Sequence, residues 1–458
     1  MIKHALAVFV FTVLMVLMLF FGSCNNMKPH KDPLADSVRT EFLHAWQAYK
    51  TYAWGQDYLK PLSKQGQNWY DSSFVITPVD AYDTMILMGL NRQAQEAKQL
   101  IMAKLSFDRN ISVKVFEFNI RLLGGLLAAY QLDHDKRFLQ LAEDLGKRLL
   151  PAFASPTGMP YRYVNLKTGA VSGTVSNPAE IGTYIVEFGM LTHFSGDSVY
   201  YKAAKKAISA VYRRRSAIGL VGTTINVDTG TWMDKSSHIG GMIDSYYEYL
   251  LKGFVLFKDP DFGEMWKHSV NAINTYLADE YEDNLWYGRA DMESGKLRKP
   301  WFGALDAFFP AVLSLDGQMD RARALLNSCF TMWQLEGIEP ELINYRTMRI
   351  LSPEYPLRPE IIESTYYLYY FTGNKRYRDM GRAYFKALKR YCRTGSGYAE
   401  LKSVISKEKV DRMDSYFLAE TLKYLYLLFS DRRKINLSKT VFNTEAHPMF
   451  MQTYWKVK

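Results

Sequence analysis

The feature that most constrains the fold of this chain is a junction that recurs along most of its length. At each junction an apolar or aromatic helix end meets a short turn of Gly, Asp or Asn, and a polar amphipathic helix follows. Apolar residues on both sides recur at the spacing of three to four residues that is typical of helices. The junctions lie near Asn91, Asp133, Asp197, Asp259, Gly317, Gly373 and Asp431.

The distance between junctions indicates the architecture. It is roughly 60 residues, longer than the repeats of helical solenoids, and leaves room for two helices and a long return loop. Seven such hairpins predict an all-α fold, an (α/α)7 barrel with the apolar helices on the inside. Closure into a ring would let a chain of 458 residues, 48% of them hydrophobic, form one domain.

The first residues have the pattern of an export signal. Lys3 and His4 precede an apolar run from Ala5 to Phe21, and small residues lead to Cys24. We expect a lipoprotein signal peptide at 1–23, lipidation of Cys24, a polar tether at 24–36 and the barrel at 37–458. The protein would then be exported and anchored to a membrane by lipid, on its periplasmic or cell-surface side. A plain signal peptide and an anchor helix are the alternatives.

Charge and cysteine content exclude several classes. The formal net charge is +10, but basic residues are scattered, and the densest run, 213–215, has no Gly-rich phosphate loop beside it. We therefore expect no nucleic-acid partner. Three cysteines are too few for a disulfide-dense scaffold. Beyond Cys24, the remaining Cys329 and Cys392 either pair or stay buried as thiols.

A carboxylate stands near the start of every predicted inner helix. A single acidic residue there is ordinary, because negative side chains favour helix N-termini. Seven together are different, since parallel inner helices would bring all their starts to one mouth and make a ring of carboxylates around a single cavity. The residues are Asp80, Glu117, Glu180, Asp244, Asp306, Glu360 and Asp414.

A cavity with carboxylates and aromatic rings suits cleavage of glycosidic bonds. One carboxylic acid protonates the leaving oxygen, and a second carboxylate activates water or attacks the sugar. The eight histidines include no pair at i, i+4, and there is no Gly-x-Ser-x-Gly or Walker motif. Two of the acids have a nearby arginine: Glu117 shares a helix face with Arg121, and Arg358 is two residues from Glu360. Each pair is either a structural salt bridge or a device that orients and tunes the acid.

With these residues the chain resembles glycoside hydrolase family 47, the class I α-mannosidases, and within it the branch of ER degradation-enhancing α-mannosidase-like proteins. The resemblance extends from about residue 71 to residue 448. The motifs that carry it lie at 80–85, 115–126, 149–161, 240–250, 357–364 and 442–448.

The resemblance implies a calcium-dependent, inverting exo-α-mannosidase that removes terminal α-1,2-linked mannose from high-mannose glycans or mannan. By matching motif, Glu117 would be the general acid, with Asp244 as the competing candidate, and Glu360 would be the base. Thr444 would bind Ca²⁺ through its carbonyl and hydroxyl oxygens, with water and sugar hydroxyls completing the coordination. The residues expected around the sugar are Arg121, Glu187, Arg358, Glu363, Tyr416 and Glu420.

The chain departs from the processing mannosidases of that family before the fifth inner helix. Ala304 stands where they have a histidine near the sugar, and Ala307 replaces a cysteine of their disulfide. Asp306 resembles neither branch, which leaves the linkage preference open. The alternatives to the enzyme described above are a mannose-glycan binding protein with weak or no turnover, an α-mannosidase of different linkage, and another α/α-toroid glycosidase or scaffold.

Overall fold

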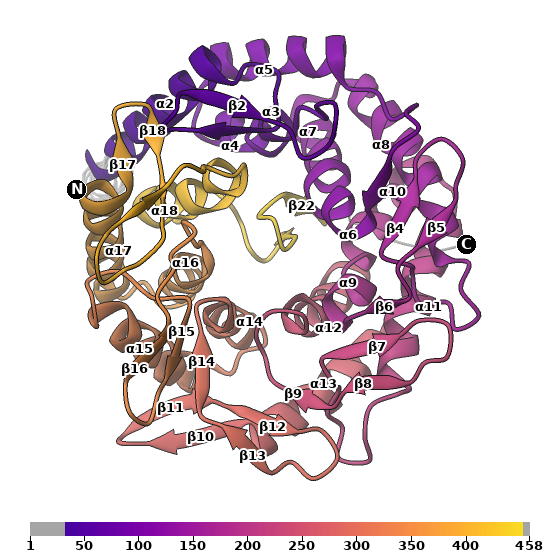
Figure 1. Cartoon of the computed structure of the whole chain (residues 1–458), viewed down its shortest axis with the longest axis vertical. Helices are drawn as coiled ribbons and strands as arrows, with labels where there is room; N and C mark the ends of the chain where they lie inside the picture. The colour runs from indigo at the N-terminus through magenta and orange to yellow at the C-terminus, as the bar shows by residue number, and fades with distance from the viewer. Residues whose placement is uncertain (1–32, 452–458) are drawn as a thin grey trace, which may run out of the picture.

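Two concentric rings of helices make up residues 33–451, the part of the chain that the computed structural model describes (Figure 1). The predicted signal peptide, Cys24 and the tether up to residue 32 lie outside these residues. Helix α2 (Pro33–Tyr52) already includes residues 33–36, which were expected to belong to the tether. Within the described residues, no helix is long and apolar enough to cross a membrane.

The predicted all-α barrel is confirmed: apolar helices form the inner ring and amphipathic helices wrap around them (Figure 1). The inner helices are α3 and α4 (Ile76–Asp80 and Tyr82–Leu87), α7 (Gly124–Asp133), α10 (Ile185–Ser195), α12 (Asp244–Phe257), α14 (Phe309–Leu315), α16 (Glu360–Thr372) and α18 (Leu422–Phe429). The outer helices are α2, α5 (Asn91–Lys104), α8 (Lys136–Leu149), α11 (Val199–Tyr212), α13 (Pro260–Tyr276), α15 (Met319–Gln334) and α17 (Lys375–Ala387).

The prediction that a helix follows the junction at Asp431 is wrong. In the described residues after α18, the chain forms strands β21 (Thr440–Phe442) and β22 (Pro448–Phe450) and no further helix. The outer position beside α18 is occupied by α2, which packs against it and buries Val38, Phe42 and Tyr49. The seventh pair therefore joins the two ends of the described chain, and this contact closes the ring (Figure 1).

At three of the other junctions, the local chemistry explains the Asp and Asn residues. An inner helix ends at a residue with left-handed backbone, as at His134 (φ 63°), Lys258 (φ 56°) and Gly373 (φ 68°). The next side chain then caps the outer helix by accepting a hydrogen bond from the backbone N–H two residues on. These caps are Asp135, Asp259 and Asn374.

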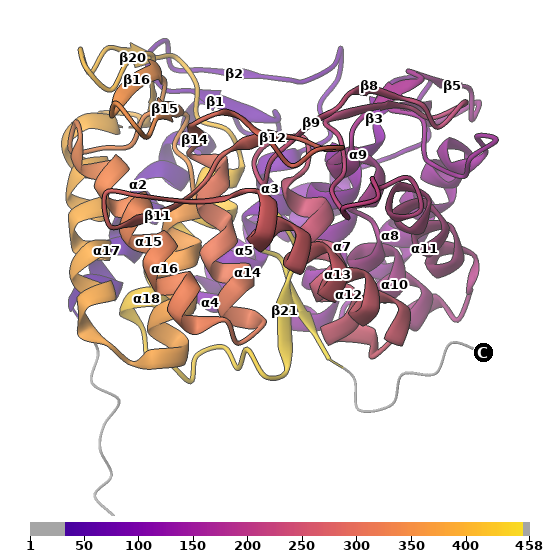
Figure 2. The same cartoon turned by 90° about the horizontal axis from the view of Figure 1, so that it is seen from below.

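Short antiparallel strands gather at one end of the barrel (Figure 2). They lead into the starts of the inner helices, so this end is the mouth. The sheets are β1–β2 (Tyr58–Lys60, Gln65–Gln67), β3–β4–β5 (Ser112–Lys114, Tyr163–Asn165, Val171–Ser172), β6–β7–β8 (Val175–Ser176, Thr224–Asn226, Trp232–Asp234), β13–β12–β9 (Leu297–Lys299, Arg289–Asp291, Ser236–Ser237), β10–β11 (Ala278–Tyr281, Asn284–Tyr287), β14–β15–β16 (Trp301–Gly303, Leu342–Asn344, Arg349–Ser352), β17–β18 (Arg393–Thr394, Gly397–Tyr398) and β19–β20 (Glu400–Leu401, Lys409–Val410).

The β21–β22 hairpin enters the barrel from the end opposite the mouth (Figure 2). Its turn, residues 443–447, lies inside the ring and is almost entirely buried. Gly124 and Gly125 on α7 make room for it, because a Cβ at Gly124 would lie 2.5 Å from Asn443 Nδ2 and one at Gly125 would lie 3.3 Å from His447. We call this segment the C-terminal turn.

The two cysteines of the described chain are free and buried, Cys329 on α15 and Cys392 at the end of a π-helical turn (Leu388–Cys392). Of the two alternatives, the structure therefore has buried thiols rather than a disulfide. Burial raises the pKa of both thiols, which favours the neutral, unreactive form.

Replacing a junction cap should weaken the barrel measurably. Asn374→Ala removes the hydrogen bond that the Asn374 side chain accepts from the backbone N–H of Arg376. We expect a loss of about 1 kcal/mol in the free energy of unfolding, measured by urea denaturation. Asn374→Asp is the matched control and should retain the stability, because aspartate also caps. Equal losses in both variants would contradict this role.

Candidate active site

A cavity of about 330 Å³ lies among the starts of the inner helices, and four of the seven predicted carboxylates line it. These are Glu117, Glu180, Asp244 and Glu360. Glu117 ends the short helix α6 (Val115–Glu117), Glu180 lies in α9 (Pro178–Gly182), and the other two begin α12 and α16. We call this space the central cavity.

The prediction that all seven carboxylates line one cavity is wrong for the other three. Asp306 lines a neighbouring cavity of about 450 Å³ together with Arg289 and Lys299. Asp414 lines a third space, of about 500 Å³. Asp80 has no exposed surface and lies behind Arg121. Asp80 is held there by hydrogen bonds with Ser415 and His447, and Asp306 turns its carboxylate back to accept a hydrogen bond from Gly303 N–H.

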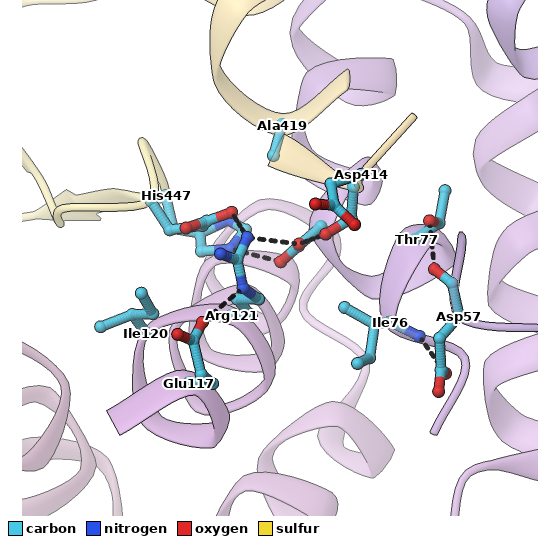
Figure 3. Close-up of polar contacts among 12 residues, drawn as sticks. Asp57, Ile76, Thr77, Glu117, Ile120, Arg121, Asp414, Ala419 and His447 are labelled. Atoms are coloured by element: carbon cyan, nitrogen blue, oxygen red, sulfur yellow. Dashed lines mark hydrogen bonds and ion pairs between the residues drawn. The ribbon is translucent and has the colours of Figure 1, made fainter. Parts of the chain in front are cut away.

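Arg121 contacts both the acid candidate Glu117 and Glu445 of the C-terminal turn. Its Nε donates to Glu117 Oε2 at 3.0 Å, and its Nη1 pairs with Glu445 and lies 3.6 Å from Asp80 (Figure 3). Its guanidinium group also lies between the rings of Trp69 and Tyr416, 5.3 and 5.6 Å from their centroids. Arg121 lies in a π-helical turn, Phe118–Leu123, a local widening of the helix that occurs often at functional sites.

The second arginine, Arg358, lies near the base candidate Glu360 and pairs with Glu341. It donates to both carboxylate oxygens of Glu341, at 2.6 and 3.0 Å, and lies 3.9 Å from Glu360. Burial raises the pKa of Glu360 to about 7 despite this arginine, and one carboxylate oxygen, Oε2, has no hydrogen-bond partner within residues 33–451. Burial likewise raises the pKa of Asp244 to about 6.

The remaining predicted sugar-binding residues fall into two groups. Tyr416 and Glu420 line the central cavity, and the Tyr416 hydroxyl donates to the carbonyl of Pro356. Neither Glu187 nor Glu363 lines the cavity; Glu187 is fully buried and Glu363 is half-buried. Glu187 accepts hydrogen bonds from Tyr249, Asn119 and Asn443, and burial raises its pKa to about 7.

Thr444 is half-buried, the least buried member of the C-terminal turn, and it lines the central cavity. Among residues 33–451, neither its hydroxyl nor its carbonyl oxygen has a hydrogen-bond partner, while its N–H donates to Tyr249. In the same part of the chain, no three His, Cys, Asp or Glu side chains converge as direct ligands of a metal. The two free oxygens of Thr444 fit a cation whose other ligands are water, and the surrounding acids Glu420 and Glu445 have pKa values raised by burial and mutual repulsion, which a cation would relieve.

Sequence reasoning missed a buried cluster of charges behind the C-terminal turn. Lys423 on α18 donates to the carbonyl of Ala446 at 2.6 Å and pairs with Asp83 at 2.7 Å. His447 bridges Asp83, at 2.7 Å, and Asp80, at 3.3 Å. Against the effect of burial, these aspartates raise the pKa of His447 to about 9, so the imidazole is protonated at neutral pH. A lysine in the apolar run of α18 was the signal that could have revealed it.

Glu445 was also missed as a residue of the site, although it lines the central cavity and pairs with Arg121. Its position directly after Thr444 was the available signal. Together, Glu445 and the buried cluster attach the C-terminal turn to α4, α18 and the Arg121 turn.

Removing the buried lysine should destabilise the protein more than removing a surface lysine. Lys423→Met leaves Asp83 buried with one partner fewer, and we expect a loss of about 3 kcal/mol or more in unfolding free energy. Lys402→Met breaks the exposed pair with Glu408 and should change it by less than about 1 kcal/mol. Urea denaturation of both variants measures the difference, and similar values would show that the cluster contributes little.

The chain is similar to a known protein family, to named relatives and to a solved structure. The family described as Glycosyl hydrolase family 47 matches residues 41–451. Mannosyl-oligosaccharide 1,2-alpha-mannosidase MNS1 of Arabidopsis thaliana is 36% identical, over 90% of this chain and 78% of its own. ER degradation-enhancing alpha-mannosidase-like protein 2 of Homo sapiens is 35% identical, over 90% and 77%. The alpha-1,2-mannosidase from Trichoderma reesei superposes with a TM-score of 0.85 at 28% identity, covering 92% of this chain and 100% of that one.

Proposed function

Because the chain belongs to glycosyl hydrolase family 47, we propose that it is a calcium-dependent, inverting exo-α-mannosidase that hydrolyses terminal α-1,2-linked mannose of high-mannose glycans or mannan. That it is a glycoside hydrolase of the mannosyl-oligosaccharide α-1,2-mannosidase type follows from the family and from relatives of that name. Calcium dependence, inversion and the linkage are carried over from the family resemblance, and the central cavity supplies the residues that these properties require.

One observation carries the proposal: the central cavity is lined by acids from four helices, α6, α9, α12 and α16, and its inner end is formed by the C-terminal turn. A volume of about 330 Å³ suits a single sugar with its water, and only the end of a glycan chain can enter a space that the turn closes from below. This arrangement favours removal of terminal residues over cleavage within a chain.

The proposed roles are carried over from the matching family motifs, and the structure adds what holds each acid. Glu117, paired with Arg121 and 3.5 Å from the Lys114 ammonium, is the proposed general acid, and Asp244 is the competing candidate because its raised pKa lets it carry a proton near neutral pH. Glu360 is the proposed base, since its unpartnered oxygen can accept a proton from water. Arg121, Arg358, Tyr416 and Glu420 would contact the sugar, while Glu187 and Glu363 would support the wall behind it.

Thr444 is the proposed direct ligand of Ca²⁺. Hard cations prefer oxygen ligands, and the Thr444 hydroxyl and carbonyl are two oxygens with no hydrogen-bond partner among the described residues. When bound, the ion would hold hydroxyl oxygens of the sugar and help to fix its ring. The chain's own part is to keep Thr444 in place through Tyr249, Asn443 and the Lys423 contact to Ala446.

The cellular setting and the family branch are also proposed rather than established. The signal-like residues before Cys24 support an exported lipoprotein anchored by lipid on the periplasmic or cell-surface side. The two named relatives, from the processing and the ER-degradation branches, match at 36% and 35% identity, so identity does not separate the branches. Ala304 and Ala307, which replace a histidine and a cysteine of the processing branch, support placing the chain in the ER-degradation branch. For a member of that branch, the alternative function is glycan binding with weak or no turnover.

Substituting the proposed base should abolish sugar release but not binding. Glu360→Gln keeps the shape of the side chain and removes its basicity, so we expect at least about a hundredfold loss in kcat on a high-mannose glycan.

NMR of the sugar released by the wild type should show β-mannose first, since inversion changes the anomer. Glu408→Gln, at an exposed position, is the matched control. Undiminished release by Glu360→Gln, or α-mannose as the first product, would refute the mechanism.

Chelation should remove both activity and a gain in stability. We expect EDTA to abolish mannose release and added Ca²⁺ to restore it. Independently of turnover, saturating Ca²⁺ should raise the stability of the wild type, by about 2.7 kcal/mol at a hundred times its dissociation constant. Thr444→Val, which is similar in shape, should lose most of this gain in thermal denaturation. Full activity after removal of divalent ions would exclude the metal role of Thr444.

A further inference from the structure

A pocket with an excess of positive charge lies on the outer wall of the barrel, where the outer helices α11 and α13 are neighbours (Figure 1). It has a volume of about 640 Å³ and shares no lining residue with the central cavity. No carboxylate of residues 33–451 lines it. We call it the basic pocket. Its polar lining includes Arg213, Arg215, Ser216, His268, Asn271 and Thr275.

The two arginines of the basic pocket are not neutralised by acids. They belong to the run 213–215, which directly follows α11, and neither forms an ion pair with a carboxylate of the described residues. Arg213 is exposed, while Arg215 lies over the Tyr212 ring at 3.8 Å and donates to the Tyr212 carbonyl at 2.8 Å. Burial and the charge of Arg213 lower the pKa of Arg214 between them, which is a sign of uncompensated positive charge.

The turn after the arginines adds backbone donors. Gly219 has left-handed backbone (φ 90°), and its N–H donates to the Ser216 carbonyl at 2.9 Å. The N–H groups of Ala217 and Ile218, which also line the basic pocket, have no hydrogen-bond partner in the described part of the chain. The turn lies close against α13, because a Cβ at Gly219 would be 3.0 Å from the Cβ of Ala272.

Ser216 adds an unpartnered polar group at the same place. Its side chain is only 8% exposed, and its hydroxyl has no hydrogen-bond partner among residues 33–451. Buried polar groups of folded proteins nearly always have a partner, so a hydroxyl of this kind beside a pocket points to a ligand or water there.

Helix α13 supplies the opposite wall of the basic pocket. His268, Asn271 and Thr275 follow one another at spacings of three and four residues, so they share one face of the helix. The Tyr212 hydroxyl and His268 Nδ1 are 2.7 Å apart, and this contact joins the wall to α11. The Asn271 amide has no partner within the described residues and can donate to a ligand.

The chemistry of the lining indicates an anion with several oxygens. Guanidinium groups, backbone N–H groups and an amide all donate hydrogen bonds, and they come from two helices and a turn rather than from one plane. This suits a tetrahedral phosphate better than a flat carboxylate. A cation would find no carboxylate here, and a nucleic acid would need a longer basic surface than this single run of arginines.

We propose that the basic pocket binds a phosphate group, either free in solution or on a lipid headgroup. Both sources present the same negatively charged oxygens to Arg213 and Arg215. The proposal does not depend on the reaction in the central cavity, because the two sites have no residue in common.

Calorimetric titration of the full chain with inorganic phosphate tests the free source. We expect saturable binding, and Arg213→Gln and Arg215→Gln should each weaken it about tenfold, since each removes a charge-assisted hydrogen bond. Arg92→Gln, at an exposed arginine of α5, is the matched control because it lowers the net charge equally outside the pocket. Arg213 is exposed, so its variant tests the proposal alone if Arg215→Gln does not fold.

Sedimentation with vesicles tests the lipid source. Vesicles of anionic phosphatidylglycerol are compared with vesicles of zwitterionic phosphatidylcholine, because a lipid anchor at Cys24 would insert into both alike. A preference for phosphatidylglycerol that Arg213→Gln reduces and Arg92→Gln retains assigns the pocket to a headgroup. Binding of inorganic phosphate without that preference assigns it to a soluble phosphate. The proposal is overturned if neither probe binds, or if Arg213→Gln and Arg92→Gln have equal effects on both.

Discussion

The contact between α2 and α18 is the constraint on which the rest of the structure depends. Six hairpins in sequence make only an open row, and the pairing of the first described helix with the last inner helix turns that row into a ring. Closure brings Glu117, Asp244 and Glu360, from helices far apart in the sequence, to the lining of one cavity. None of these acids would form a site on its own helix, where it is an ordinary N-terminal residue.

Closure also brings like charges together, and their repulsion is partly offset by arginines, a lysine and a protonated histidine. Arg121 faces Glu117 and Glu445, Arg358 faces Glu341 and Glu360, and Lys423 with His447 faces Asp83. Glu360 and Glu420 have pKa values raised first by burial and then by neighbouring carboxylates that these cations do not fully offset. The site is therefore built from incompletely balanced charge, which is a common property of groups that move protons or hold cations.

Local patterns in the sequence were sufficient for the barrel and for part of the site. The junctions could be read because a left-handed residue and an Asx cap leave a fixed signature, as at Gly373 and Asn374. The acids at helix starts identified Glu117, Asp244 and Glu360 as neighbours once parallel inner helices were assumed. The pairing of α2 with α18 and the contact of His447 with Asp83 were not predictable in this way, because more than 300 residues separate the partners and no periodicity links them. Asp306 and Asp414 show a second limit: spacing places a residue at the mouth but does not decide which cavity its side chain faces.

The C-terminal turn has a consequence for the order of events during turnover. Because the turn fills the end of the barrel opposite the mouth, a sugar in the central cavity can enter and leave only through the mouth. The remainder of the glycan occupies that exit until it dissociates. For the proposed reaction the shortened oligosaccharide must therefore leave first and the free mannose second, so the monosaccharide is the product that competes with the next substrate molecule.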